Sequence, residues 1–136
     1  METKKKILVV DDKGINRYML GGIFREEYEV IEAAGGQKAI DIIAEDSKNL
    51  AVVLLDILMP VIDGFGVLEY MKQKNLLESL PVVIVTDDDS EETSDRAFDY
   101  KVADIVIKPF EPRIIRRRVQ NIIELYTYRD KYGNGV

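Results

Sequence analysis

The chain has 136 residues and a formal net charge of −6, and it contains no cysteine and no histidine. A chain of this length can bury a core in one domain, and the missing residue types exclude disulfides, thiolate metal sites and histidine-based catalysis. The acidic charge disfavours binding to nucleic acid or to anionic membranes, and the N-terminal apolar run is too short for a signal peptide or a membrane span, so a cytoplasmic location is expected.

Five short apolar runs predict β-strands, and segments with helical spacing lie between them. The runs are continuous rather than alternating, as expected for strands buried on both faces of a parallel sheet. They are Ile7–Val10, the weaker Tyr28–Ile31, Ala51–Leu55, Val82–Val85 and Ile105–Ile107. Because strands and helices alternate strictly, we predict an α/β fold with a doubly wound five-stranded parallel sheet and helices on both faces. The expected strand order is 2-1-3-4-5.

The helix predicted over Asp88–Asp99 differs from the others. It is rich in acidic residues and offers little apolar surface. The spacing of Asp89 and Glu92 is typical of a capping box, with Asp89 at the cap. Weak burial predicts that this helix is loosely held, although a solvated face fits the pattern as well.

The last helix has a long apolar stripe and is expected to run to about Tyr132. Residues 1–132 are thus expected to form one domain, followed by a flexible tail over residues 133–136. This helix is longer than such a domain requires. The chain is therefore expected to be part of a larger protein.

Chemically useful side chains follow four of the predicted strands. Asp11 and Asp12 follow the first strand, Asp56 follows the third, Thr86 ends the fourth and Lys108 ends the fifth. In the predicted order, the first and third strands are neighbours at the topological switch point, where ligands bind. Three carboxylates at close range need a compensating cation, and Mg²⁺ suits such oxygen ligands. Each residue alone is commonplace, but their joint placement indicates a phosphoryl site.

These residues stand in motifs that resemble the receiver domain of two-component response regulators, which is CheY-like and flavodoxin-like in fold. The resemblance covers nearly the whole chain. Its motifs are VVDD at Val9–Asp12, LLDILMPVIDG at Leu54–Gly64, VIVT at Val83–Thr86 and KPF at Lys108–Phe110, with Asn16 and Arg17 also familiar. The segment M-P-x-x-D-G after Asp56 is the most specific mark.

The resemblance implies a role for each carboxylate. Asp56 would be the phosphoacceptor, taking a phosphoryl group from a sensor histidine kinase or a phosphotransfer protein. Asp12, Asp56 and the backbone carbonyl of Leu58 would ligate Mg²⁺ directly. Asp11 would act on the metal mainly through bound water.

Thr86 and Lys108 receive roles from the same resemblance. Thr86 would bind a phosphoryl oxygen and move inward when the group arrives. Lys108 would pair with the phosphoryl group, or with Asp56 before modification, and its bond to Pro109 is expected to be cis. The domain would catalyse only its own phosphorylation and dephosphorylation.

Three positions depart from the family pattern. Ile105 stands where an aromatic switch residue is common, so ring rotation cannot report phosphorylation at this place. Asp87 follows Thr86 where a small residue is usual; its carboxylate either repels the phosphoryl donor or points to solvent. Leu58 stands where polar residues are frequent, and its side chain is expected to exclude hydrolytic water and prolong the life of the phosphoryl group.

A basic cluster on the last helix suggests a further contact. Its members are Arg113, Arg116, Arg117 and Arg118. A solvated face explains them, and the net charge argues against nucleic acid. A symmetric homodimer is a third interpretation, built from the Asp88–Asp99 helix, the Ile105 strand and the Arg113–Arg118 helix.

Other functions remain to be weighed against the phosphoacceptor. A degenerate receiver that binds partners without phosphorylation is the main alternative, because Asp87 and Ile105 depart from the pattern. A flavin-binding protein of the same fold would need a phosphate loop free of Asp11 and Asp12. A phosphatase of the haloacid dehalogenase type would need an Asp at the place of Leu58. The sequence leaves the cognate kinase, the output and the regulated process open.

Overall fold

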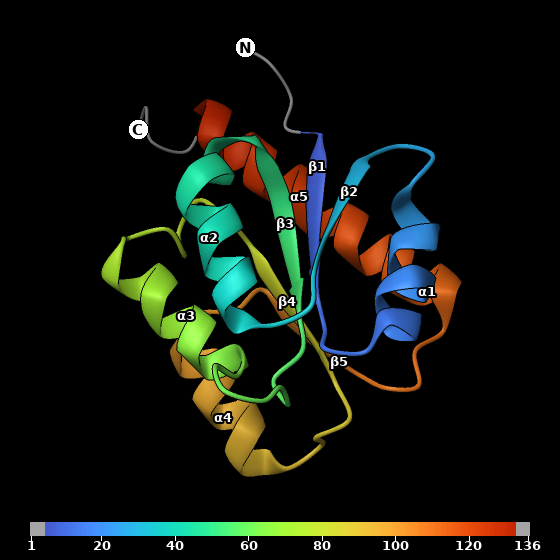
Figure 1. Cartoon of the computed structure of the whole chain (residues 1–136). Coiled ribbons are helices and arrows are strands. Elements are labelled where there is room, and N and C mark those ends of the chain that lie inside the picture. Colours follow the sequence, from blue (N-terminus) through green and yellow to red (C-terminus); the bar gives the residue numbers. More distant parts are fainter. Residues whose placement is uncertain (1–4, 133–136) are drawn as a thin grey trace.

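A computed structural model describes residues 5–132 of the chain, so the expected tail at 133–136 lies outside the described residues. Strands and helices alternate through this part (Figure 1). In chain order they are β1 (Lys6–Val10), α1 (Gly14–Phe24), β2 (Glu29–Ala33), α2 (Gly36–Asp46), the 3₁₀ turn η1 (Ser47–Asn49), β3 (Leu50–Leu55), α3 (Gly64–Gln73), β4 (Val82–Thr86), α4 (Glu91–Asp99), β5 (Asp104–Ile107) and α5 (Pro112–Tyr132). Within the described residues, no helix is both long and apolar enough to cross a membrane.

The five strands form one parallel sheet in the order β2-β1-β3-β4-β5, which confirms the predicted topology. Helices α2, α3 and α4 cover one face, and α1 and α5 cover the other (Figure 1). Successive residues of a strand point to opposite faces, so β3 supplies Val53 to one core and Leu54 to the other. Continuous apolar runs are therefore necessary for the central strands.

The largest differences from the predicted boundaries concern the second strand and the acidic helix. The second strand runs from Glu29 to Ala33, because its residues pair in parallel with β1 through Ala33. The acidic helix begins at Glu91 rather than at Asp88. Its cap is Ser90, not Asp89, since the Ser90 hydroxyl accepts the backbone N–H of Thr93 at 3.2 Å. The capping-box prediction was thus wrong by one position.

Helix α4 is weakly buried, as predicted. Ala97 is the one buried residue among the nine that form it, all of which the structure describes. Helix α5 reaches Tyr132, also as predicted, and buries Ile115, Val119 and Ile123 against the sheet. The two helices therefore differ sharply in how firmly they are attached.

Candidate functional site

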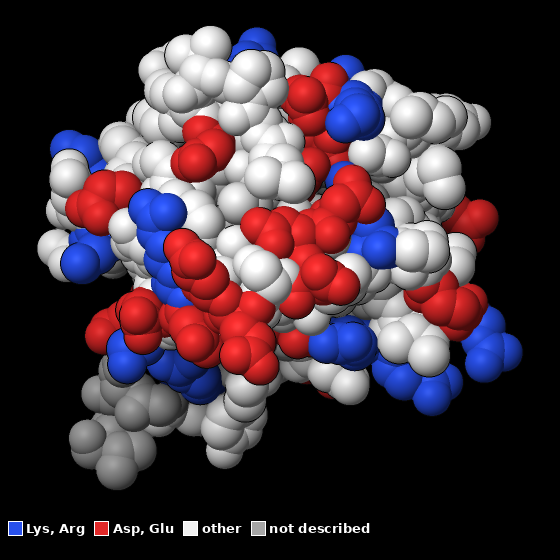
Figure 2. All heavy atoms as spheres, turned by 90° about the horizontal axis from the view of Figure 1, so that it is seen from below, with Lys and Arg blue, Asp and Glu red and all other residues white. Residues whose placement is uncertain are grey.

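The predicted site residues converge at the carboxyl-terminal edge of the sheet. Asp11, Asp12 and Asp56 each offer an oxygen within 4.8 Å of the others. Asp11 and Asp56 are buried, and so is Thr86 at the end of β4. Figure 2 views this edge end-on and shows acidic side chains gathered across its centre. The acids brought together by β1 and β3 thus form the cluster that the topology predicts.

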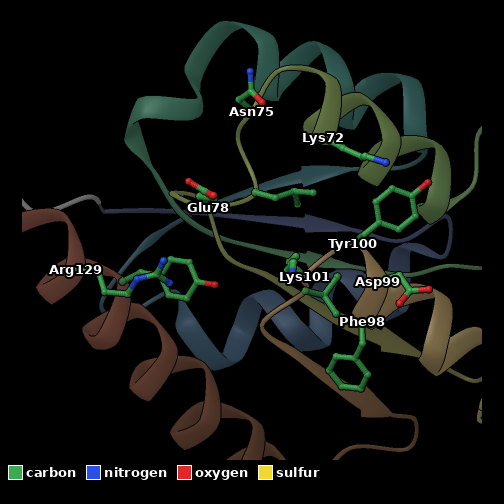
Figure 3. A pocket seen from close by; sticks show the side chains of 11 residues that line it. Lys72, Asn75, Glu78, Phe98, Asp99, Tyr100, Lys101 and Arg129 are labelled. Carbon is green, nitrogen blue, oxygen red and sulfur yellow. The ribbon is translucent and has the colours of Figure 1, made fainter. Parts of the chain in front are cut away.

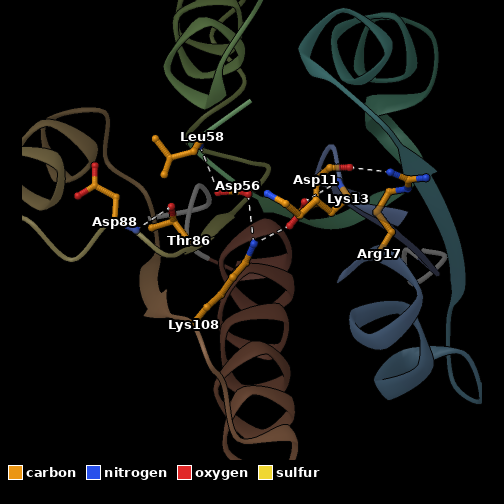
Figure 4. A network of polar contacts seen from close by, with 8 residues as sticks. All are labelled: Asp11, Lys13, Arg17, Asp56, Leu58, Thr86, Asp88 and Lys108. Carbon is orange, nitrogen blue, oxygen red and sulfur yellow. Dashed lines mark hydrogen bonds and ion pairs between the residues drawn. The ribbon is translucent and has the colours of Figure 1, made fainter. Parts of the chain in front are cut away.

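Lys108 reaches into this cluster and joins two of its acids (Figure 4). Its ammonium lies 2.7 Å from Asp11 Oδ2 and 3.2 Å from Asp56 Oδ2. The cation is therefore nearer to Asp11 than to Asp56, the partner expected before modification. The backbone N–H of Lys108 also donates to the Thr86 carbonyl, and the Lys108–Pro109 bond is cis, as the resemblance implies.

The local sequence around Asp56 fixes the direction of its carboxylate. The N–H of Leu58 donates to Asp56 Oδ1 at 3.2 Å. Gly64 starts α3 so close to the chain that a Cβ there would lie 2.6 Å from the Asp56 carbonyl oxygen. Asp63 caps the same helix by accepting the N–H of Gly66. The D-G pair of the motif therefore serves to pack the loop against Asp56.

Residues that carried no assigned role hold the β1–α1 loop. The Arg17 guanidinium donates to the Asp11 carbonyl at 2.8 Å and to Glu32 at 2.9 Å. The N–H of Lys13 donates to Asp11 Oδ1 at 2.9 Å. Arg17, on α1, was visible in the sequence as a family-like residue, but its partner Glu32 lies on β2 and gave no signal.

Burial and neighbouring charges shift the titration of the central pair. Burial raises the pKa of Asp56; the ammonium of Lys108 opposes this rise, and the charge of Asp11 adds to it. Burial lowers the pKa of Lys108, but its hydrogen bond to Asp11 and the charges of both acids raise that pKa overall. The Lys108 ammonium thus lies closer to Asp11 than to Asp56, and it does not fully offset the cost of burying the charge of Asp56.

One oxygen of Asp12 indicates what is needed to balance this charge. Among side-chain atoms of the described residues, Asp12 Oδ1 is buried without a hydrogen-bond partner. Buried polar oxygens are nearly always paired, so an unpaired one beside two other carboxylates suits a cation. The donor set consists of oxygens alone, which suits a hard ion such as Mg²⁺.

The residues that depart from the family pattern lie around this cluster. Asp87 is exposed, in agreement with the interpretation that its carboxylate points to solvent. Leu58 is 53% exposed at the rim. Ile105 is partly buried and packs against the α2–α4 core.

A hollow lies elsewhere, and none of the predicted site residues lines it. It has a volume of about 830 Å³ and lies between the C-terminal halves of α3 and α5 and the segment that links α4 to β5 (Figure 3). That segment leads into the start of β5, at the edge of the sheet opposite the carboxylates. The hollow has a mixed lining of aromatic, acidic and basic side chains, so its shape alone assigns no chemistry.

Comparison with known proteins agrees with the fold and identifies the family. A family model described as response regulator receiver domain matches residues 7–120. The probable transcriptional regulator ycf27 of Cyanophora paradoxa is 33% identical over 123 residues, which cover 88% of this chain and 48% of that protein. The chain spans about half the length of the curated relatives it matches.

Solved structures share the architecture. The signal receiver domain of a putative Luxo repressor protein from Vibrio parahaemolyticus is 21% identical, with a TM-score of 0.85 over 93% of this chain and 95% of that one. The CheX–CheY complex with beryllium fluoride and Mg²⁺ from Borrelia burgdorferi is 24% identical, with a TM-score of 0.79 over 87% and 88% of the two chains. At these identities the similarity concerns the fold.

Proposed function

This chain belongs to the family of response regulator receiver domains, and on that premise we propose that it accepts a phosphoryl group on Asp56 in two-component signalling. The observation that supports this most is Lys108, held between Asp11 and Asp56 beside the unpaired oxygen of Asp12. The backbone N–H of Lys108 donates to the carbonyl of the buried Thr86, which holds Thr86 next to this group of charges. Such a set suits the charge of a phosphoryl group in transfer.

Mg²⁺ is the proposed cofactor. Asp12 and Asp56 would hold it, with the carbonyl of Leu58, while Asp11 would act through water. The bound ion would neutralise the charge that gathers on the phosphoryl oxygens. The Borrelia burgdorferi structure is of a CheX–CheY complex with beryllium fluoride and Mg²⁺, which supports the same choice for this fold.

In the proposed reaction, Asp56 is the nucleophile. One of its carboxylate oxygens forms a bond to phosphorus as the bond from phosphorus to the nitrogen of a phosphohistidine breaks, and that nitrogen takes up a proton. Lys108, which pairs with the Asp56 carboxylate beforehand, then pairs with the negative phosphoryl oxygens. The Thr86 hydroxyl donates to one of these oxygens. Hydrolysis of the aspartyl phosphate resets the switch, so the domain catalyses only its own modification.

The proposed donor is a sensor histidine kinase or a phosphotransfer protein, which implies a cytoplasmic domain over residues 1–132. Neither nucleic acid nor a membrane is proposed as a direct partner. The chain spans only about half the length of its relatives, so its residues assign neither an output nor a regulated process.

A homodimer through α4, β5 and α5 is proposed as well. Arg113 and Arg117 are exposed along a groove of about 230 Å³ on α5, where they are free to meet an acidic partner such as α4 of a second copy. Arg118 is less free, because it pairs with Asp104 of the same chain at 2.6 Å. Arg116 likewise pairs with Glu27 of the same chain. The dimer would therefore rest on Arg113 and Arg117.

The family relatives do not favour the alternative of a binding module without phosphorylation. Asp87 is exposed, the three acids offer oxygens within 4.8 Å of one another, and the Lys108 ammonium lies 3.2 Å from Asp56. The alternative would leave this costly arrangement of buried charge without a purpose.

The test is the intact mass of the protein after incubation with Mg²⁺ and acetyl phosphate. We expect the wild type to gain the mass of one phosphoryl group and the Asp56→Asn variant to gain none. Equal gain in both proteins would remove Asp56 as the acceptor. No gain in the wild type, with Mg²⁺ binding shown separately, would favour the binding module or a strict need for the kinase.

A further inference from the structure

The buried hydroxyl of Thr86 is tied to the loop that leads into α4. The backbone N–H of Asp88 donates to Thr86 Oγ1 at 3.3 Å (Figure 4). The Thr86 side chain is fully buried at the end of β4. This bond therefore connects the proposed phosphoryl site to the loop before α4, two residues further along the chain.

The carboxylate of Asp88 holds the first turn of α4. Its Oδ2 accepts the hydroxyl of Thr93 at 2.7 Å, and its Oδ1 accepts the N–H of Ser90 at 3.0 Å. These hydrogen bonds, chiefly the one from Thr93, lower the pKa of Asp88, so its carboxylate is ionised at neutral pH. Figure 4 shows this carboxylate directed away from Asp56. Asp88 thus binds Thr86 through its backbone and α4 through its side chain.

The rest of α4 is attached mainly at its far end. Tyr100, which follows the helix, donates its hydroxyl to Glu69 of α3 at 2.8 Å. The Arg96 guanidinium lies 3.9 Å from the centre of the Phe65 ring. Ala97 is the one buried residue of the helix. The first turn therefore depends on Asp88 for its position, while the last turn is fixed to α3.

We propose that Asp88 and Thr93 form a clamp that positions the Thr86 hydroxyl and couples it to the first turn of α4. This inference rests on the proposed function, because the signal that it transmits is a phosphoryl group on Asp56. In the family pattern, an aromatic switch residue is common where this chain has Ile105. The clamp would supply the coupling that Ile105 cannot. Asp88 acts through Thr86 and is a positioning residue, not a catalytic one.

The Thr86 hydroxyl accepts from Asp88 and would donate to the phosphoryl group, and the strengths of these two hydrogen bonds give the direction of the coupling. At 3.3 Å, the bond from Asp88 N–H to Thr86 is longer than the usual range. Hydrogen bonds to ionised oxygens are about twice as strong as neutral ones. A phosphoryl group on Asp56 that accepts the O–H of Thr86 therefore draws the hydroxyl toward itself, and this shift stretches the long bond that Thr86 Oγ1 accepts from Asp88. The N–H that is released must find a new partner, and the carboxylate transmits that movement to Ser90 and Thr93.

Coupling of this kind is reciprocal. A variant that loosens the clamp lowers the cost of moving Thr86, so it binds a phosphoryl group more tightly. Thr93→Val removes the hydroxyl bound by Asp88 and keeps the shape of the side chain. Thr93→Ser keeps the hydroxyl and is the matched control.

The first experiment measures binding of beryllium fluoride, a phosphoryl mimic, in the presence of Mg²⁺ by calorimetry. We expect Thr93→Val to bind about two- to tenfold more tightly than wild type, which corresponds to one hydrogen bond. Thr93→Ser is expected to match the wild type. The same samples are compared by amide hydrogen exchange, where binding should speed exchange in the first turn of α4 in wild type and change it less in Thr93→Val.

A second experiment needs no ligand. Thr86→Val and Thr93→Val are each expected to speed amide exchange at Asp88 and in the first turn of α4, while exchange at Tyr100 stays unchanged. Amide exchange rates in both variants equal to those of the wild type would overturn the clamp. An affinity for beryllium fluoride in Thr93→Val equal to that of the wild type would overturn it as well. If the wild type fails to bind beryllium fluoride at all, the proposed function fails, and the ligand-free experiment alone decides the clamp.

Discussion

At the scale of single residues, the site is a balance of buried charge. Lys108 contacts both Asp11 and Asp56, yet burial still leaves the pKa of Asp56 raised. The folded protein therefore binds a proton at Asp56 more tightly than the unfolded chain does. The free energy of unfolding therefore falls as the pH rises from the ordinary aspartate pKa of about 4 to the raised pKa of Asp56. Above the raised pKa, this loss of stability is complete.

The variant Asp56→Asn tests this balance without metal. It removes the charge and keeps the shape, and Lys108 retains Asp11 as a partner. We expect a higher free energy of unfolding than wild type at neutral pH in buffer with chelator, measured by urea denaturation. The gain should shrink as the pH falls toward 4, because the wild-type carboxylate is then protonated. A variant less stable than wild type at pH 7 would contradict the expected direction of this charge effect.

Leu58 permits a second test at this scale. Its side chain lies at the rim of the site, where it is expected to keep water from the phosphorylated carboxylate. Leu58→Asn should therefore shorten the half-life of the phosphorylated protein, followed by intact mass after removal of the phosphodonor. Val61→Asn, an exposed position on the same loop, serves as the control. A half-life in Leu58→Asn equal to or longer than that of wild type would refute the role.

At the scale of elements, α4 shows where sequence patterns are informative and where they fail. The shortage of apolar residues predicted weak burial of α4. That prediction is confirmed, because Ala97 is the one residue of this helix that is buried. The cap was misplaced because Asp89 and Ser90 are both good caps, and backbone geometry selects Ser90. The bond from Tyr100 to Glu69 joins two helices far apart in sequence, so no local pattern indicates it.

Tyr100→Phe tests how α4 is held at its C-terminal end. The change removes the hydroxyl that binds Glu69 and keeps the ring against Phe65. We expect faster amide exchange in the last turn of α4 and a small fall in Tm. Tyr128→Phe, at an exposed ring on α5, should change neither quantity. Equal exchange in wild type and Tyr100→Phe would mean that packing alone fixes the helix.

At the scale of the whole molecule, the buried charge of Asp56 opposes folding, and a bound cation would offset it. A ligand that binds only the folded state stabilises it by an amount that grows with its concentration. The unpaired oxygen of Asp12 stands beside Asp11 and Asp56 at the sheet edge. Global stability should thus depend on Mg²⁺ through a few atoms at one edge.

Addition of Mg²⁺ is expected to raise the Tm of the wild type, measured by calorimetry at constant ionic strength. Asp12→Asn should lose most of this rise, because it removes a charged ligand. Asp87→Asn should keep it, since Asp87 is exposed at the same edge but lies outside the cluster. A rise of the same size in all three proteins would indicate nonspecific screening of the acidic surface.

The sequence alone determined the alternation of elements and the five side chains at the strand ends, because burial on both faces demands continuous apolar runs and parallel strands end at one edge. It also predicted the strand order, as one of the common orders of doubly wound sheets, and the structure confirmed it. Only the tertiary structure decided which groups pair. It brought Lys108 closer to Asp11 than to Asp56, left Asp12 Oδ1 unpaired and joined Thr86 to α4 through Asp88. Such pairings depend on ångström-scale distances between separate segments, which the packing of the two cores fixes.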